Sequence, residues 1–516
     1  MLMPIDVVWF KRDLRTLDHE PLLKAASSKN KTHCIFLIEP RRLEQLDCSP
    51  IHIQWELDCA TEIKQKIESL GGSFEISHTE IEDSLIQLDE EYQIENLYSH
   101  EETGIEWSYN RDIALHKWCK SRGIKWTEFP SNGVVRVLQN RNTWKRQRDS
   151  RMKLELKPAP RKIVGIDRMT EIPSLTELGI EPRSLTNRQQ PGENAALKCL
   201  HSFLYQRGEP YRWAVSSPVK AEKHGSRLAP YLSVGCISVR RAVQNTKNRM
   251  NQLKAIKSQG EDVGTWLKSL SSFQSRLAWH CHFIQKLEME PTLNYKAQNA
   301  VIDSRLNREL NEEKFEVWKA GMTGWPFFDA CMRQLTSTGW INFRMRAMLM
   351  SVASYNLWLP WREVGTHLAT LFLDYEPGIH WSQVGMQSGT TGINTVRAYS
   401  VTKQGIDHDK SGDYIRKWVP ELRVIPTKYI HEPWKMSEEE QSNFSCRIGV
   451  DYPAPILDEL ESRKEGIKKT YAARKSPEAK DRSRAVYQKH GSRKRSRKKS
   501  SRKDNSSNGS RQTTLF

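Results

Sequence analysis

Residues 340–348 read WINFRMRAM, a strip of Trp, Ile, Phe and Met that has the composition of a protein interior but also carries Arg344 and Arg346. A buried charge costs several kcal/mol unless it is paired, so each guanidinium group needs an anionic partner. Two positions apart on a helix, the two side chains point to nearly opposite sides. The stretch therefore predicts a helix in a protein interior and two different anions beside it.

The helical pattern continues on both sides of this stretch. After residue 196 strand signals nearly vanish, and apolar residues recur with a helical period at 194–204, 229–245, 266–288 and 327–359. We therefore predict an all-α domain over residues 196–450. The many Trp and Arg residues in its apolar segments could enclose a flat aromatic ligand; the alternative is that the aromatic side chains only fill the core.

Residues 1–130 alternate between strand-like and helix-like segments. Apolar runs that favour strands lie at 6–10, 33–39, 73–78, 94–100 and 125–129, and the clearest helical segments between them are 52–70 and 106–122. This order predicts a doubly wound α/β domain with five parallel strands. Such sheets bind ligands at their carboxyl edge. No GxGxxG or GxxxxGK[ST] motif follows a strand, so a dinucleotide or nucleoside triphosphate is not indicated there.

The remaining segments differ in composition. Residues 131–195 lose periodicity and gain Pro, Arg and Asn, which predicts an interdomain linker. Residues 451–516 are expected to form a basic, largely disordered tail. Of the net charge of +18, residues 481–516 supply +10, from 12 Lys and Arg against Asp481 and Asp504. This tail could merely aid solubility, or it could grip nucleic-acid phosphates.

Composition also bears on the cellular setting. No apolar run approaches the 18 residues of a membrane-spanning helix, and the first residues lack the pattern of a signal peptide. The nine cysteines include no CxxC pair, so we expect free thiols rather than disulfides or a cysteine-ligated metal. We expect a cytoplasmic, nucleoid-associated monomer, or a nuclear one if the source is eukaryotic.

Seven motifs, taken together, resemble one protein family. In chain order they are VVWFKRDLRTLDHEPL (7–22), HGSRLAPYLSVGCISVR (224–240), TGWPFFDACMRQL (323–335), WINFRMRAM, LPWREVG (359–365), DYEPGIHWSQ (374–383) and DYIRKWVPEL (413–422). Over residues 1–440 the chain resembles the cryptochrome/photolyase family, without ligands for an iron–sulfur cluster. The resemblance implies an α/β domain, a linker and a helical domain that holds one FAD in a folded-up conformation.

The resemblance also implies cofactor-binding residues. Gly225 and Ser226 are expected to open a helix whose N-terminal amides suit a pyrophosphate. Arg346 would pair with Asp374 beside the isoalloxazine, and Glu376 would meet ribose or adenine groups; the alternative is a solvated acidic pair at a helix end. His380 falls near flavin N5, or it packs on Trp381 as a structural residue. The full expected set is Tyr211, Gly225, Ser226, Arg227, Leu228, Arg346, Asp374, Glu376 and His380.

Other positions would serve DNA binding and electron transfer. Arg344 would face a DNA phosphate at the cavity mouth, and Trp279 would stack on an unstacked base. The expected DNA-binding set is Gln274, Trp279, Arg344, Lys403 and Gln404. Trp381 and Trp361 match the proximal and middle tryptophans of the family's electron chain. The distal position reads as Arg or Leu near 308–310, so a relay to the surface must use another aromatic such as Trp318 or Trp325, or be absent.

Departures from the family pattern leave two questions open. Arg276 stands where enzymes that repair cyclobutane dimers carry Glu, Ala347 replaces a pocket Met, and Gln383 or Val384 replaces a second pocket Trp. These changes leave it undetermined which DNA lesion the pocket would fit. Ser108 stands at a folate-binding Glu position, so an antenna chromophore could be a folate, a deazaflavin or another pigment.

The predicted function is light-driven repair of pyrimidine dimers in ultraviolet-damaged DNA by electron transfer from photoexcited, reduced FAD. The first alternative is a cryptochrome-type blue-light photoreceptor. The second is a flavin-bearing DNA-binding protein without repair activity.

The last residues, RQTTLF (511–516), carry a separate motif. Gln512, Leu515 and Phe516 resemble the QxxLF peptides with which bacterial repair and replication proteins bind the sliding clamp. The alternatives are a tail that is recognised differently and a chance match.

Overall fold

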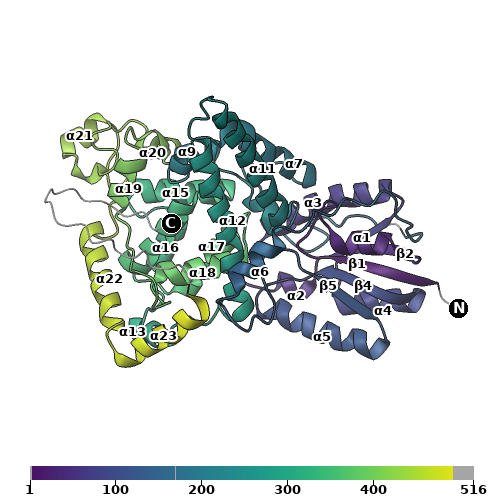
Figure 1. The fold of residues 1–516 in the computed structure, drawn as a ribbon. Helices are drawn as coiled ribbons and strands as arrows, with labels where there is room; N and C mark the ends of the chain where they lie inside the picture. Colours follow the sequence, from purple (N-terminus) through teal and green to yellow (C-terminus); the bar gives the residue numbers. More distant parts are fainter. Residues whose placement is uncertain (1–2, 169, 492–516) are drawn as a thin grey trace, which may run out of the picture.

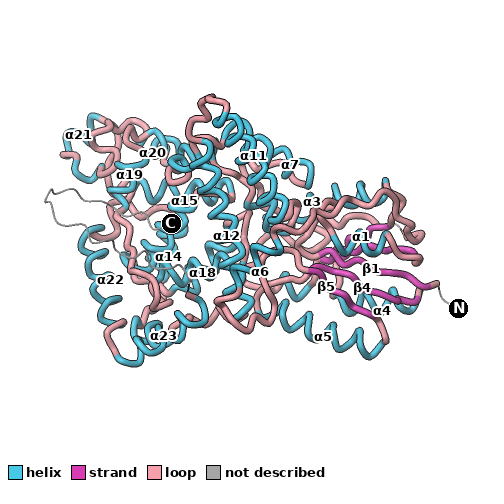
Figure 2. Tube along the Cα trace, viewed as in Figure 1, coloured by secondary structure: helices cyan, strands magenta, loops and turns pink. Residues whose placement is uncertain are grey.

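The computed structural model describes residues 3–168 and 170–491, and it places an α/β domain beside a larger helical domain (Figure 1). The sheet has five parallel strands in the order β3-β2-β1-β4-β5. Its strands are β1 (Pro4–Phe10), β2 (Lys31–Leu37), β3 (Ser73–Ser77), β4 (Gln93–His100) and β5 (Lys125–Phe129). Figure 2 shows that the strands of the described residues all lie in this domain. The prediction of a doubly wound parallel sheet is confirmed.

Both faces of the sheet are covered, which explains why its strands are apolar runs rather than alternating patterns. Val7 and Trp9 of β1 pack in one core cluster with α4 and α5, and Val8 and Phe10 pack in another with α1 and α3. The helices of this domain are α1 (Glu20–Ala26), α2 (Pro40–Leu43), α3 (Pro50–Ser69), α4 (Ile81–Glu91) and α5 (Glu106–Arg122).

The linker, residues 131–195, contains one helix that the sequence did not predict, α6 (Trp144–Arg151). Trp144 explains why this charged segment is ordered. Its indole is buried, and Nε1 donates a hydrogen bond to the carbonyl of Gly133 at 3.0 Å.

The helical domain begins at α7 and wraps around the long helix α12 (Trp266–Met289). The prediction of an all-α second domain is confirmed. Its helices up to residue 356 are α7 (Glu193–Ser202), α8 (Tyr211–Ala214), α9 (Pro218–His224), α10 (Ala229–Ser233), α11 (Val239–Ser258), α12, α13 (Ala300–Leu306), α14 (Glu312–Ala320), α15 (Pro326–Thr338) and α16 (Phe343–Ser351), with π-helical turns η1 (Phe203–Arg207) and η2 (Val352–Asn356). They are followed by α17 (Trp361–Leu371), α18 (Pro377–Ser388), α19 (Val401–His408), α20 (Asp413–Trp418), η3 (Pro420–Leu422), η4 (Pro433–Lys435) and α21 (Glu438–Asn443).

Two further helices, α22 (Glu459–Ala473) and α23 (Pro477–His490), correct the predicted tail. The expectation of disorder from residue 451 is wrong for residues 451–491. Gly466 packs so closely on η2 that a Cβ there would lie 2.0 Å from the carbonyl oxygen of Tyr355. Small buried residues rather than a large apolar face anchor α22, so composition could not reveal it. The basic run and the QTTLF motif, residues 492–516, lie outside the described residues.

Within the described ranges, no helix is both long enough and apolar enough to cross a bilayer. The nine cysteines are free thiols.

Candidate functional site

The helical domain contains a large cavity that is open to solvent. Helices α12, α16 and α18 and the segment between α9 and α10 supply its wall. The aromatic residues of the wall are Tyr211, Phe273, Trp279, Phe283, Trp340, Phe343, Phe372 and Tyr375. Large aromatic walls with a few polar groups are typical of sites for flat organic ligands.

Arg346 and Asp374 form a bidentate ion pair in this wall. Nη1 and Nη2 of Arg346 each lie 2.9 Å from a carboxylate oxygen of Asp374, and Nε donates to the carbonyl of Ile341 at 2.8 Å. The Asp374 side chain is only 4 % exposed, so the pair is desolvated on the acidic side. Asp374 is therefore one of the two anions that the sequence required.

Arg344 contacts a different part of the molecule. Its Nη2 donates to the hydroxyl of Ser216 at 3.4 Å, and Arg344 is not among the residues that line the cavity. The two guanidinium groups therefore leave α16 in different directions, as the helical spacing predicts.

The expected pyrophosphate segment lines the cavity, but its local structure differs from the prediction. Gly225 caps the C-terminus of α9, and Ser226 and Arg227 lie in the turn before α10, so the two residues do not open a helix. Arg227 has φ 59°, and its guanidinium lies over the ring of Trp340 at 3.8 Å. Burial lowers the pKa of Arg227 to about 10. Leu228 packs in the core and does not line the cavity.

Several buried polar atoms of cavity-lining residues have no hydrogen-bond partner among the described residues. They are Nη1 of Arg227, Nδ1 of His280, Oδ1 of Asn342, Nε2 of Gln383 and Oε1 of Gln387. Leaving such an atom unpaired costs about 1–3 kcal/mol. Donors and acceptors that converge on one aromatic-walled space fit a ligand that has both rings and polar groups. FAD, with its isoalloxazine, hydroxyls and pyrophosphate, has this combination.

An acidic side chain of the helical domain and a basic side chain of the α/β domain form an ion pair at the edge of the cavity. Glu376 pairs with Arg12 of the α/β domain at 2.7 Å, and its carboxylate also accepts a hydrogen bond from the amide of Gly378 in the first turn of α18. Glu376 is therefore not a solvated residue at a helix end. Nothing in the sequence pattern pointed to Arg12.

His380 is buried in the cavity wall. Its Nε2 donates to the carbonyl of Gly365 at 2.8 Å, which leaves Nδ1 of the neutral ring as an acceptor. Burial lowers the pKa of His380 to about 4, so the ring is neutral near pH 7. The ring also packs edge-on against Trp381 at 4.9 Å. His380 therefore packs on Trp381, as one alternative from the sequence has it, and it also lines the cavity; its place near flavin N5 stays a prediction.

Trp381 and Trp361 are in contact, with ring centroids 6.2 Å apart and planes at 80°. Trp361 donates its indole N–H to the carboxylate of Asp303 at 3.0 Å, and Trp381 donates its own to the hydroxyl of Tyr375 at 2.9 Å. Trp318 and Trp325 are 0 % and 1 % exposed, so neither can end a relay at the surface. These two candidates for the surface end of a relay are therefore excluded, and the prediction that remains is a relay through another aromatic or no relay.

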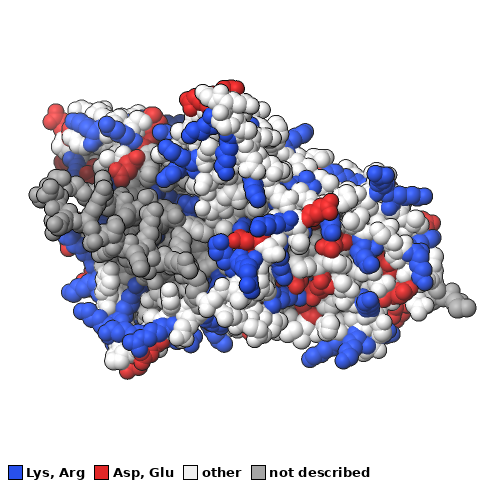
Figure 3. Space-filling model, viewed as in Figure 1, with Lys and Arg blue, Asp and Glu red and all other residues white. Residues whose placement is uncertain are grey.

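The cavity wall also contains an arginine that stacks on aromatic rings. The guanidinium of Arg276 lies 4.6 Å from the ring centroid of Trp279 and 5.3 Å from that of Phe343. Gln274 does not line the cavity. Its side chain is directed at α11, where Nε2 donates a hydrogen bond to the carbonyl of Val243. Lys403 and Gln404 lie on α19 rather than in a loop, and neither lines the cavity. Lys and Arg side chains are spread over the face shown in Figure 3, with Asp and Glu between them.

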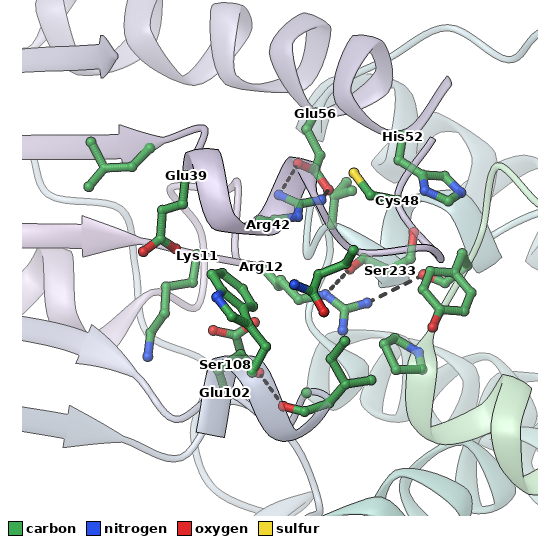
Figure 4. Close-up of a pocket in the computed structure, with 18 of the residues that line it drawn as sticks. Lys11, Arg12, Glu39, Arg42, Cys48, His52, Glu56, Glu102, Ser108 and Ser233 are labelled. Carbon is green, nitrogen blue, oxygen red and sulfur yellow. Dashed lines mark hydrogen bonds and ion pairs between the residues drawn. The ribbon is translucent and has the colours of Figure 1, made fainter. Parts of the chain in front are cut away.

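A second cavity lies between the two domains at the carboxyl edge of the sheet. Figure 4 shows Arg12 reaching across it towards Ser233, whose carbonyl accepts from Nε at 2.9 Å, and Arg42 paired with Glu56. Ser108 lines this cavity and donates to the carbonyl of Ile105. Further lining residues are Trp9, Lys11, Glu39, Asp47, His52, Glu102, Trp107, Arg111 and Tyr375.

Some functional residues could not be predicted from the motifs alone. Trp340, which stacks on Arg227, was read only as interior, and Gln387 has no special pattern around it. Tyr375 lies within the DYEPGIHWSQ motif and lines both cavities, but the motif predicts no role for it. Tertiary contacts, rather than local sequence, single out these three residues.

Comparison with known proteins gives two matching family models. Residues 6–151 match the model described as DNA photolyase, and residues 273–472 match the FAD binding domain of DNA photolyase. The chain is 26 % identical over 483 residues to a cryptochrome DASH of Gloeobacter violaceus, covering 88 % of this chain and 93 % of the relative. It is 28 % identical over 487 residues to a deoxyribodipyrimidine photo-lyase of Alkalihalophilus pseudofirmus, covering 90 % and 97 %.

Among solved structures, a bacterial class III photolyase from Agrobacterium tumefaciens has a TM-score of 0.80 at 22 % identity, covering 92 % of this chain and 99 % of that one. At this identity the likeness supports the shared fold.

Proposed function

The chain belongs to the cryptochrome/photolyase family, and on that premise we propose that it repairs pyrimidine dimers in ultraviolet-damaged DNA with light. Its cofactor is FAD. When bound and reduced, FAD supplies the electron that splits a dimer after light absorption. The observation that carries the proposal is that one cavity wall contains both the Arg346–Asp374 pair and the Arg276–Trp279 stack.

The chain's own residues would bind and orient both ligands. Arg346, held by Asp374, would place a fixed cation beside the flavin and favour its anionic reduced form. Arg227 and the adjacent turn would hold the pyrophosphate. Trp279 would stack on an extruded base, a contact worth about 1–3 kcal/mol. Arg276 can only donate hydrogen bonds, so it would contact carbonyl or phosphate oxygens of the lesion.

The test is lesion turnover. Purified, FAD-loaded protein in its reduced state is illuminated with blue light in the presence of an oligonucleotide that carries a defined dimer, and restored bases are counted. We expect repair that depends on light and is lost in Trp279→Ala. FAD-loaded protein that restores neither cyclobutane dimers nor pyrimidine-pyrimidone adducts would contradict the proposal.

A cryptochrome-type photoreceptor is the second candidate, because the Trp361–Trp381 contact suits photoreduction whether or not DNA is repaired. Relatives of similar identity bear both names. A photoreceptor would change shape or partner affinity on illumination without restoring any lesion. The repair assay therefore separates the two.

For the cavity between the domains we propose an antenna chromophore. Its place at the carboxyl edge of a doubly wound sheet, with Trp9 and Trp107 in its wall, suits an aromatic pigment. Equilibrium binding of a reduced folate and of a deazaflavin to the full chain would decide between the two pigments.

We also propose that residues 512–516 bind a bacterial sliding clamp. This proposal rests on the sequence QTTLF alone.

A further inference from the structure

Tyr375 lies between the two cavities and contributes to the wall of each. Its hydroxyl oxygen accepts a hydrogen bond from the indole N–H of Trp381 at 2.9 Å. The same hydroxyl donates a close hydrogen bond to Oδ2 of Asp47, from the α/β domain. An indole, a phenol and a carboxylate thus form one continuous hydrogen-bonded row that crosses the domain interface.

The surroundings keep the phenol protonated and its proton directed at Asp47. Burial and the neighbouring Asp47 raise the pKa of Tyr375 well above its ordinary value. The ring of His52 stacks on Tyr375 at 5.5 Å, but its Nε2 is engaged with the carbonyl of Phe372, and burial lowers the pKa of His52 to about 4. Asp47 is 8 % exposed, so water does not readily replace the phenol as its partner. Asp47 is therefore the one base in hydrogen-bond contact with the phenol among the described residues.

We propose that Tyr375 is a proton-coupled electron donor to Trp381. The inference rests on one part of the proposed function, the FAD site, beside which the indole of Trp381 would give up one electron when oxidised FAD absorbs light. Tyr375 then passes one electron to the indole radical cation while its O–H bond breaks and an O–H bond forms on the Asp47 carboxylate. The products are a neutral indole, a neutral phenoxyl radical and a carboxylic acid. A thiolate reductant from solution then gives one electron to the phenoxyl radical and becomes a thiyl radical, while the Asp47 carboxylic acid returns its proton to the phenol oxygen.

A phenol that gives up its proton as it loses an electron avoids forming a phenol cation inside the protein. That cation would be costly in a buried site, where an unpaired charge has little solvation. The two hydrogen bonds of Tyr375 avoid this cation. When the electron moves to Trp381 and the proton moves to Asp47 in one step, the positive charge on the indole and the negative charge on the carboxylate are both neutralised.

Trp361 offers a competing outcome. Its indole N–H also points at a carboxylate, that of Asp303, at 3.0 Å. If Trp361 rather than Tyr375 gave an electron to the Trp381 radical cation, Trp361 would lose its indole proton to Asp303. The product would then be a neutral indolyl radical instead of a phenoxyl radical. The two radicals differ in optical absorption and in electron paramagnetic resonance, so the route can be read directly.

The experiment uses the full chain loaded with oxidised FAD and excited by a short flash without added reductant. Transient absorption and electron paramagnetic resonance follow the radicals in H₂O and in D₂O. We expect a phenoxyl signal, formed as the Trp381 radical cation decays and formed more slowly in D₂O. Tyr375→Phe should abolish this signal and lengthen the life of the Trp381 radical cation by more than tenfold. Asp47→Asn should strongly lower the yield of phenoxyl radical while the phenol remains in place.

Tyr355→Phe is the control, because Tyr355 is a phenol inside the same domain that has no hydrogen bond to either tryptophan of the contact pair; it should behave like the unmodified chain. An equal phenoxyl signal in Tyr375→Phe, an indolyl radical as the only product, or no D₂O effect would each overturn the inference. Lesion repair is measured on the same samples. A phenoxyl signal without repair would overturn the proposed function and leave this inference standing.

Discussion

At the scale of single residues, Arg346 determines the charge balance of the cavity. Arg346→Ala would leave the carboxylate of Asp374, 4 % exposed, without its bidentate partner. Removing one member of a buried pair costs about 3–5 kcal/mol. We expect a lower melting temperature and a lower FAD content after purification, measured by differential scanning fluorimetry and by the flavin-to-protein absorbance ratio.

Arg344→Ala is the control for this variant, since Arg344 lies on the same helix but donates to Ser216 outside the cavity wall. It should keep FAD and weaken binding to damaged DNA, in line with about 1.5–3 kcal/mol for a charged hydrogen bond. Equal loss of flavin in both variants would contradict the assignment of the two arginines to different partners.

Buried histidines predict how stability depends on pH. Burial lowers the pKa of His380, His52 and His280 to about 4 each. Between pH of about 6.5 and 4 the unfolded chain binds protons that the native state refuses, so stability falls as the pH drops through this window. Denaturant unfolding at several pH values between 7.5 and 4.5 should show this loss.

His380→Gln should reduce the slope, because it removes one of the groups that must stay neutral. One unit of pKa shift corresponds to about 1.4 kcal/mol, so the contribution of a single ring is of the order of 2–3 kcal/mol at the acid end. A slope that is the same in both proteins would mean that the native state can protonate His380 freely.

At the scale of elements, the hydrophobic pattern of the sequence predicts the bounds of a strand or helix well where one or both faces of that element are apolar. The apolar run at 6–10 lies in β1, whose residues 5–10 are buried, and the helical segment at 52–70 lies within two residues of α3, which buries one face against the sheet. It failed where contacts are made by small or polar groups. The turn at Gly225 was read as a helix start, although Gly225 ends α9 and Arg227 takes a left-handed backbone conformation. Such details depend on packing against Trp340, which no local pattern encodes.

The docking of α22 shows the same limit and gives a prediction. In Gly466→Ala the new methyl group would lie 2.0 Å from the carbonyl oxygen of Tyr355, a backbone atom of η2 that cannot move aside cheaply. We expect α22 to separate from η2, with a drop in melting temperature and faster proteolytic cleavage after residue 456. Lys468→Ala, on the exposed side of the same helix, should leave both properties unchanged. Normal resistance to protease in Gly466→Ala would show that the contact tolerates a side chain.

At the scale of the whole molecule, the two cavities and the domain interface are one connected system. Arg12, from the end of β1, lines the cavity between the domains and pairs with Glu376, which lines the cavity of the helical domain. Tyr375 and Asp47 make a second link across the same interface. Sequence motifs identified the two domains separately, but the residues that join them come from segments more than 300 positions apart. This separation explains why the sequence could not predict the two contacts that cross the interface.

The QTTLF motif predicts how the chain would be brought to DNA under replication. Leu515 and Phe516 would fill an apolar pocket of a bacterial sliding clamp, and Gln512 would make polar contacts at its rim. Burying each apolar side chain contributes about 1.5–3 kcal/mol, so the double variant Leu515→Ala/Phe516→Ala should lose binding by at least about a hundredfold. A peptide of residues 505–516 tests this by fluorescence anisotropy against a purified clamp. Binding on the order of micromolar would suffice, because a protein held by both DNA and clamp gains from the high local concentration of the second site. Equal binding by the double variant would mean that only the basic residues of the peptide are recognised, and raising the salt concentration should then abolish binding.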